Sequence, residues 1–237
     1  MAGNVQIQVL DRDGKPVPDA VVVVYPANPA EAPPTLLQAN PTIEQQKMRF
    51  VPAVTVVMPG STVRFTNQDR WDHHVRGAPA GLLASSTQAT GAAGTAAESP
   101  NGFELRLAGK ADGTPANFSD VKLDTVGVVL LSCHLHGSMR GHVFVTDSAW
   151  TLKTDSDGIA RFASVPNGAA QVRVWHAEQL VDLPRKALNV VAAPVLDTIQ
   201  LSVVPRTRRA SRSSSAPLAA EPVTTTTAIS TQLAHQH

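Results

Sequence analysis

The residue types best suited to chemistry gather in one short segment, residues 131–143 (LSCHLHGSMRGHV). Cys133 is followed after three residues by His136, and His136 after three more by Met139. A thiolate and a thioether are soft ligands that hold Cu(I), while imidazole also suits Cu(II). A single cysteine is usually a small buried hydrophobe and a single methionine usually packs in a core. The spacing of the three residues favours a metal site over these structural roles.

A second stretch of the chain supplies further imidazoles. Residues 62–65 have a strand pattern, and the sequence TNQDRWDHHV that continues from them contains His73 and His74. Two imidazoles, one thiolate and a weak axial thioether are the ligand set of blue-copper electron-transfer centres. The two stretches therefore predict one mononuclear copper site shared between a short loop and a separate strand. Binding of the ion would then contribute to the free energy of folding.

The composition excludes several other classes of function. The chain has 237 residues, of which 43% are hydrophobic, enough for one or two domains with their own cores. The net charge is +1, and residues 1–204 hold 16 basic and 18 acidic groups, so we expect no nucleic-acid partner. One cysteine excludes an intramolecular disulfide, and it excludes a zinc site or a dinuclear copper centre built on paired cysteines. Eight histidines are too few for the additional clusters of copper enzymes, so we expect no enzyme. Apolar runs stay far below the roughly 18 residues of a membrane span, so we expect none.

Strand signals dominate the chain. Short runs rich in β-branched residues recur and are separated by turn signals such as Asp13-Gly14, Pro59-Gly60 and Asp157-Gly158. Long segments with a helical period are absent, although residues 177–188 could form one short helix limited by Pro184. The sequence predicts an all-β, sandwich-like protein.

Two hairpin patterns at opposite ends of the chain resemble one known domain. VQIQVLDRDGKPVPDAVVVVYP and TDSDGIARFASVPNGAAQVRVWHAE are similar to the two hairpins of carboxypeptidase-regulatory-like (transthyretin-like) β-sandwiches. The resemblance implies a discontinuous domain of residues 4–27 plus 148–204, with a second domain at residues 40–147 inserted into it or packed beside it. Residues 205–237 are polar and arginine-rich, and we expect a disordered tail there, either solvated or used for anchoring or partner binding.

The middle segment resembles the cupredoxins. The pattern C-x₂-H-x₂-M followed by R-G is similar to the short ligand loop of amicyanin, and MRFVPAVTVVMPGSTVRFTNQD with HHV is similar to the strands that lead to the first histidine ligand. The whole arrangement from about residue 5 to 177 is also similar to the plastocyanin-like methylamine utilization proteins. These share HHV, the Cys-His-Met loop, a TDxDG turn and VRVWH. The resemblance implies a cupredoxin Greek-key β-sandwich.

The resemblance also implies the metal ligands, the bound ion, the partners and the cellular location. His73, Cys133, His136 and Met139 occupy the ligand positions, and His73 is preferred to His74 because it matches the histidine of the family's H-n-V motif. One copper ion that alternates between Cu(I) and Cu(II) and redox partner proteins are implied with them. We expect the protein in the periplasm or cell envelope, because cytosolic copper is scarce and the family is exported. We also expect it to be a monomer. The N-terminal sequence MAGNVQIQVL shows no signal segment of its own.

This chain departs from the family at the neighbours of two ligands. His74 stands where many cupredoxins have an asparagine that fixes the ligand loop, and His134-Leu135 replaces Thr-Pro of amicyanin, so we expect a softer loop. His134 and His142 are interpreted as surface residues, with a role in the approach to the metal or in a peripheral site as the alternative.

Four other residues lie outside the predicted ligand set. Trp71 is either a core anchor or part of the surface where a redox partner docks. His176 is interpreted as structural, and His235 and His237 fall in the tail.

Three functions compete on these observations. The leading hypothesis is a type 1 copper protein that carries single electrons between partners. The second is a copper-binding module for storage or delivery that does not cycle between oxidation states. The third is a metal-free carbohydrate- or protein-adhesion module, against which the complete ligand set argues.

Overall fold

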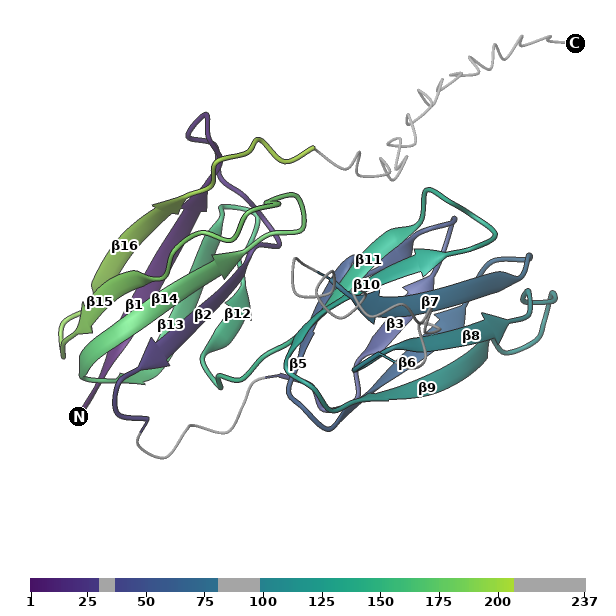
Figure 1. Cartoon of the computed structure of the whole chain (residues 1–237), viewed down its shortest axis with the longest axis horizontal. Coiled ribbons are helices and arrows are strands. Elements are labelled where there is room, and N and C mark those ends of the chain that lie inside the picture. Colours follow the sequence, from purple (N-terminus) through teal and green to yellow (C-terminus); the bar gives the residue numbers. More distant parts are fainter. Residues whose placement is uncertain (30–36, 81–98, 207–237) are drawn as a thin grey trace, which may run out of the picture. The chain divides into compact units, whose positions relative to one another are not determined.

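The computed structural model describes residues 1–29, 37–80 and 99–206, and this part of the chain contains strands and no helix (Figure 1). The all-β class predicted from the sequence is confirmed. The short helix considered for residues 177–188 is wrong, because a turn is followed there by the strand β15 (Lys186–Val190). The predicted tail lies outside the described residues from position 207 onward. The described residues contain no helix whose length and hydropathy would let it cross a membrane.

One pair of sheets is built from the two ends of the described chain (Figure 1). Its three-stranded sheet has the order β13 (Ile159–Pro166), β1 (Ala2–Leu10) and β16 (Val195–Gln200). Its four-stranded sheet has the order β12 (Thr151–Lys153), β2 (Val21–Pro26), β14 (Gly168–Trp175) and β15. Alternate side chains of these strands, among them Ile7, Val22 and Val172, form one apolar core.

A second pair of sheets comes from the middle of the chain. The five-stranded sheet has the order β5 (Val54–Val57), β11 (Arg140–Val145), β10 (Gly127–Cys133), β7 (His73–Pro79) and β8 (Phe103–Leu107). The four-stranded sheet has the order β4 (Phe50–Val51), β3 (Thr42–Gln45), β6 (Ser61–Asn67) and β9 (Asn117–Leu123). Their core includes Phe65, Leu131 and both Cys133 and Met139.

The uninterrupted valine run of β2 has a physical cause. Val22 and Val24 point into the first core, whereas Val21 and Val23 belong to a separate cluster that also contains the side chains Val54, Phe144 and Trp175. A strand covered on both faces has no need of the alternation of polar and apolar residues seen in a half-exposed strand. The boundaries of the domains, and the likeness of the first sandwich to carboxypeptidase-regulatory-like domains, stay predictions.

The register of two strands positions the site. In the antiparallel pair of β7 and β10, Cys133 lies opposite Val75 and Ser132 opposite Arg76. The start of β7, at His73, is therefore beside the end of β10, at Cys133. The close packing of this sheet depends on Gly77, because a Cβ atom there would come within 2.2 Å of the Phe103 ring.

Candidate metal centre

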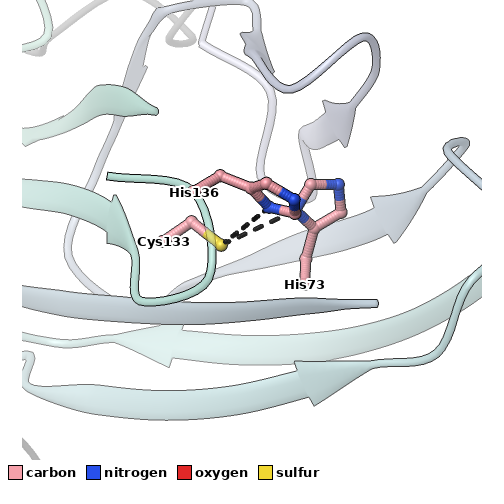
Figure 2. A group of neighbouring side chains, drawn as sticks. All are labelled: His73, Cys133 and His136. Atoms are coloured by element: carbon pink, nitrogen blue, oxygen red, sulfur yellow. Dashed lines mark hydrogen bonds between the residues drawn. The ribbon is translucent and has the colours of Figure 1, made fainter. Parts of the chain in front are cut away.

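Three of the predicted site residues converge where β7 begins and β10 ends. The Sγ atom of Cys133 lies 3.6 Å from Nδ1 of His73 and 3.6 Å from Nδ1 of His136. The two Nδ1 atoms lie 3.2 Å apart. Figure 2 shows both imidazole rings turned toward the sulfur atom from different chain segments. In the described residues this is the one group of three or more His, Cys, Asp or Glu side chains close enough to share a metal ion.

These separations suit a single bound ion. Bonds of about 2.0 Å to nitrogen and about 2.3 Å to sulfur place the two ligand atoms about 3.7 Å apart when they subtend about 120° at the metal. Two nitrogen ligands that subtend about 105° lie about 3.2 Å apart. The spacings between the three side chains match these values, so an ion could bind with little rearrangement of the protein. The donor set of two imidazoles and one thiolate fits copper.

The other ring nitrogen of His73 is held by a buried carboxylate. Nε2 of His73 lies 3.0 Å from Oδ2 of Asp69, and both side chains are buried. An ionised carboxylate only accepts hydrogen bonds, so Nε2 must carry the proton. In the neutral ring Nδ1 then keeps a free lone pair, and Nδ1 is the atom that faces Cys133 and His136. Asp69 thus selects the tautomer and orientation of His73 that a metal ligand requires.

Asp69 is kept ionised by the hairpin between β3 and β4. The N–H of Lys47 donates to its Oδ1 (2.6 Å) and the N–H of Met48 donates to its Oδ2 (3.0 Å). Burial by itself would raise the pKa of Asp69, but the hydrogen bonds from Met48, His73 and Lys47 outweigh it and the pKa lies below its ordinary value. Lys47 and Met48 both have positive φ, at 52° and 55°. This left-handed backbone conformation is energetically unfavourable for residues other than glycine, and both residues adopt it at the turn whose N–H groups bind Asp69.

A buried amide fixes the loop that carries Asp69. Asn67 is fully buried, and its Nδ2 donates to the carbonyl oxygens of Trp71, Leu107 and Ala108 at 2.9–3.1 Å. Its Oδ1 accepts the N–H of Asp69 at 2.9 Å. Asn67 therefore ties the loop before His73 to the end of β8. Neither Asn67 nor Asp69 is among the site residues predicted from the sequence, although the Asn-x-Asp pattern shortly before the histidine pair was a usable signal.

The ligand loop after β10 is held at both ends. The N–H of His134 donates to the carbonyl oxygen of His74 (3.0 Å), and the N–H of Met139 donates to that of His136 (2.9 Å). The side chain of Met139 is 1% exposed and lies in the same core cluster as Cys133. Met139 is therefore buried in the core beside this loop, whereas His136 is half-buried.

The other predicted residues lie outside the cluster. The ring centroids of His74 and His134 are 4.8 Å apart, and neither residue belongs to the group that contains Cys133. His142 is half-buried with its ring 5.3 Å from that of Trp175, and it is not part of the group of possible metal ligands. Trp71 is 45% exposed, which excludes a role as a core anchor, and its ring centroid lies 6.5 Å from that of His136.

His176 has the structural role expected of it. Its Nδ1 accepts the N–H of Glu178 at 3.2 Å in the turn after β14, far in sequence from the cluster. The terminal His235 and His237 lie outside the described residues.

Comparisons with known proteins give likenesses in structure only. No protein-family model and no curated protein matches the chain. Amicyanin from Paracoccus versutus (Thiobacillus versutus) is 17% identical with a TM-score of 0.30, over 53% of this chain and 97% of that chain. An oxidised amicyanin mutant is 19% identical with a TM-score of 0.32, over 54% of this chain and 99% of that chain. A Cu-containing nitrite reductase from Thermus scotoductus SA-01 is 19% identical with a TM-score of 0.30, over 52% of this chain and 25% of that chain. At these TM-scores the likenesses do not bear on function.

Proposed function

We propose that this protein is a mononuclear type 1 (blue) copper protein of the cupredoxin kind that carries single electrons between redox partner proteins. His73, Cys133 and His136 are the strong ligands in this proposal, and Met139 is the weak axial ligand. The observation that carries it is the convergence of two Nδ1 atoms and one Sγ atom at separations that suit one ion. The ligand pattern of the sequence supports the same assignment.

The residues around the cluster suit electron transfer because they hold the ligands still. Copper supplies the redox chemistry when bound, by alternating between Cu(I) and Cu(II). Asp69 fixes one imidazole, and the loop hydrogen bonds fix the other, so the ligand positions need to change little when an electron arrives. His136 is half-buried whereas His73 and Cys133 are buried. An electron would therefore enter and leave through the ring of His136.

The proposal also includes the organisation and location of the chain. We assign the copper site to a domain of residues 40–147, and residues 4–27 with 148–204 to a second, discontinuous β-sandwich. The strands of the two sandwiches fall within these ranges, apart from the first two residues of β1. The protein would act as a monomer in the periplasm or cell envelope, without substrate chemistry of its own.

Addition of Cu(II) to the metal-free protein tests the proposal. We expect an intense visible absorption from charge transfer between the Cys133 thiolate and Cu(II), together with binding of one ion at this site. Cys133→Ser should abolish the band, whereas Ser132→Ala, which alters the neighbouring residue, should keep it. A tightly bound but colourless product would contradict the proposal.

Cyclic voltammetry separates the electron carrier from its alternative. A reversible one-electron couple of the copper-loaded protein is expected from a carrier. A coloured copper protein without such a couple would favour a copper storage or delivery module that does not cycle.

A further inference from the structure

The five-stranded sheet carries an excess of positive charge on its outer face. Four of its strands, β11, β10, β7 and β8, contain three arginines and one glutamate as their only Lys, Arg, Asp or Glu residues. The neighbours of these residues in each strand point into the core, so the charged side chains lie on the outer face, because successive side chains of a strand alternate. The three arginines, Arg76, Arg106 and Arg140, form what is called here the arginine face.

The strand register brings the arginine face next to the ligand loop. Ser132, the residue before Cys133, lies opposite Arg140 on one side and opposite Arg76 on the other. The strand β8 pairs with the far edge of β7 and adds Arg106. Neighbouring strands are about 4.8 Å apart, so the Cα atoms of the three arginines fall within about 16 Å. Because Ser132 and Arg140 close the hairpin whose loop carries His136, this surface begins beside the proposed copper site.

The single carboxylate on this face does not neutralise the three guanidinium groups. Oε1 of Glu104 lies 3.7 Å from Nε of Arg76, and its Oε2 lies 3.6 Å from Nε2 of His74. The guanidinium group of Arg140 donates to a main-chain carbonyl oxygen (2.8 Å), which leaves its charge in place. Among the residues that the structure describes, neither Arg106 nor Arg140 forms an ion pair, and both are exposed. Two positive charges therefore face solvent without a carboxylate partner.

The other sheet of the same sandwich has balanced charges. Its strands β4, β3, β6 and β9 contain two basic and two acidic residues, namely Glu44, Arg64, Asp120 and Lys122. Two hydrogen bonds of 2.8 Å join the guanidinium group of Arg64 to the carboxylate of Asp120. The positive excess therefore belongs to the sheet that contains Cys133.

We propose that the arginine face is the docking surface for a redox partner protein whose own surface is acidic. The inference rests on the proposed electron-carrier function and adds the chemistry of the partner. Complementary charges raise the rate at which two proteins associate, and guanidinium groups can bind carboxylates through two hydrogen bonds at once. Three arginines are few for a nucleic acid, which is held by many phosphate contacts. A partner held by Arg140 and Arg76 would lie beside the loop of His136, the ring through which the electron is proposed to pass.

Electron transfer from reduced cytochrome b₅, a small acidic haem protein, to the Cu(II)-loaded full chain tests this inference. Between ionic strengths of about 0.01 M and 0.5 M, the Debye length shortens from about 30 Å to below about 8 Å, and the bimolecular rate constant should fall about tenfold or more. Arg106→Gln and Arg140→Gln should each lower the low-salt rate constant about 2–5-fold. The rate constants of variants and unaltered protein should converge at high salt, because screening removes the attraction.

Lys122→Gln is the matched control for these variants. It also removes one exposed positive charge, but from β9 on the other sheet, where Lys122 pairs with Asp124 at 3.0 Å. The control should change the low-salt rate constant by less than about twofold. The thermal unfolding midpoint checks that each variant is folded.

A rate constant that does not depend on salt would overturn the inference. Arginine variants that react as fast as Lys122→Gln would overturn it too, and this is the result expected if the arginines of residues 206–212 attract the cytochrome instead. Tighter arginine-dependent binding to phosphatidylglycerol vesicles than to the cytochrome would show that the face binds membranes, and would also overturn it.

A separate measurement on the metal-free full chain distinguishes failure of this inference from failure of the electron-carrier proposal. A loaded protein without a blue band and a one-electron couple would count against the carrier. Amide chemical shifts of the metal-free chain, titrated with oxidised cytochrome b₅, then test the surface alone. Shift changes centred on residues 76, 106 and 140 would support an acidic partner at this face, whereas changes elsewhere, or none, would overturn it.

Discussion

Replacement of Asp69 by asparagine isolates the contribution of one buried carboxylate to the metal centre. The carboxylate accepts hydrogen bonds from His73 and from the N–H groups of Lys47 and Met48. Asparagine has nearly the same shape but only one acceptor oxygen and no charge. The variant therefore keeps the packing, removes a negative charge near the ion and weakens the control of the His73 tautomer.

The magnitude of the change follows from the geometry. Oδ2 of Asp69 lies 3.0 Å from Nε2 of His73. Adding the ring and a metal–nitrogen bond of about 2.0 Å puts the charge about 7 Å from a bound ion. At an effective dielectric constant of about 20, loss of this attraction costs Cu(II) about 2 kcal/mol relative to Cu(I). For a one-electron couple this raises the reduction potential by about 100 mV. Loss of a partner of this kind also lowers metal affinity by about 10–100-fold.

Voltammetry and competitive copper titration of Asp69→Asn measure these effects directly. Asp72→Asn is the matched control, because Asp72 is exposed in the same loop and its Oδ1 accepts the N–H of Gly109 rather than a bond from His73. We expect the control to change the potential far less. The explanation of the tautomer and charge effect is refuted if Asp69→Asn binds copper with unchanged affinity at an unchanged potential.

Three further changes give separate predictions. Met139→Leu nearly conserves volume, so it should cost less than about 1.5 kcal/mol of unfolding free energy while its visible spectrum and potential shift through loss of the thioether. Gly77→Ala should lower the unfolding free energy by about 1–3 kcal/mol in denaturant titrations, because its Cβ would overlap the Phe103 ring, whereas Gly137→Ala meets nothing within 4 Å and should be near neutral. The pKa of Asp155 is lowered by a backbone hydrogen bond and a guanidinium group. Its stabilisation is present above the unfolded pKa and lost as the pH falls through the folded one, so Asp155→Asn should lower the urea midpoint at pH 7 but not at pH 2.

The cluster itself was predictable because its information is local in the sequence. The spacing of Cys133, His136 and Met139 within one loop, and a histidine after a strand, predict a copper site. Three of these side chains, His73, Cys133 and His136, converge in the structure. Alternation of side chains also predicts that His134 points away from Cys133, and in the structure His134 is exposed whereas Cys133 is buried. The all-β class followed from repeated β-branched runs between turn signals.

The support of the cluster was not predictable, because it depends on contacts between distant segments. Asp69 accepts hydrogen bonds both from His73 and from the turn of Lys47 and Met48. The sequence pattern does not show that this turn packs against the loop that carries Asp69. The sequence also did not predict the contact of His142 with Trp175, whose ring lies 5.3 Å away although it is distant in sequence. Such contacts between distant segments determine how far a side chain is buried, and the alternation of polar and apolar residues within one strand does not predict them.

Electron paramagnetic resonance of the full chain loaded with one equivalent of Cu(II) tests the central claim most directly. A covalent bond between copper and the Cys133 sulfur predicts unusually narrow hyperfine splitting, replaced by broad splitting in Cys133→Ser. Broad splitting in the unaltered protein that the Cys133→Ser change does not affect would contradict the account.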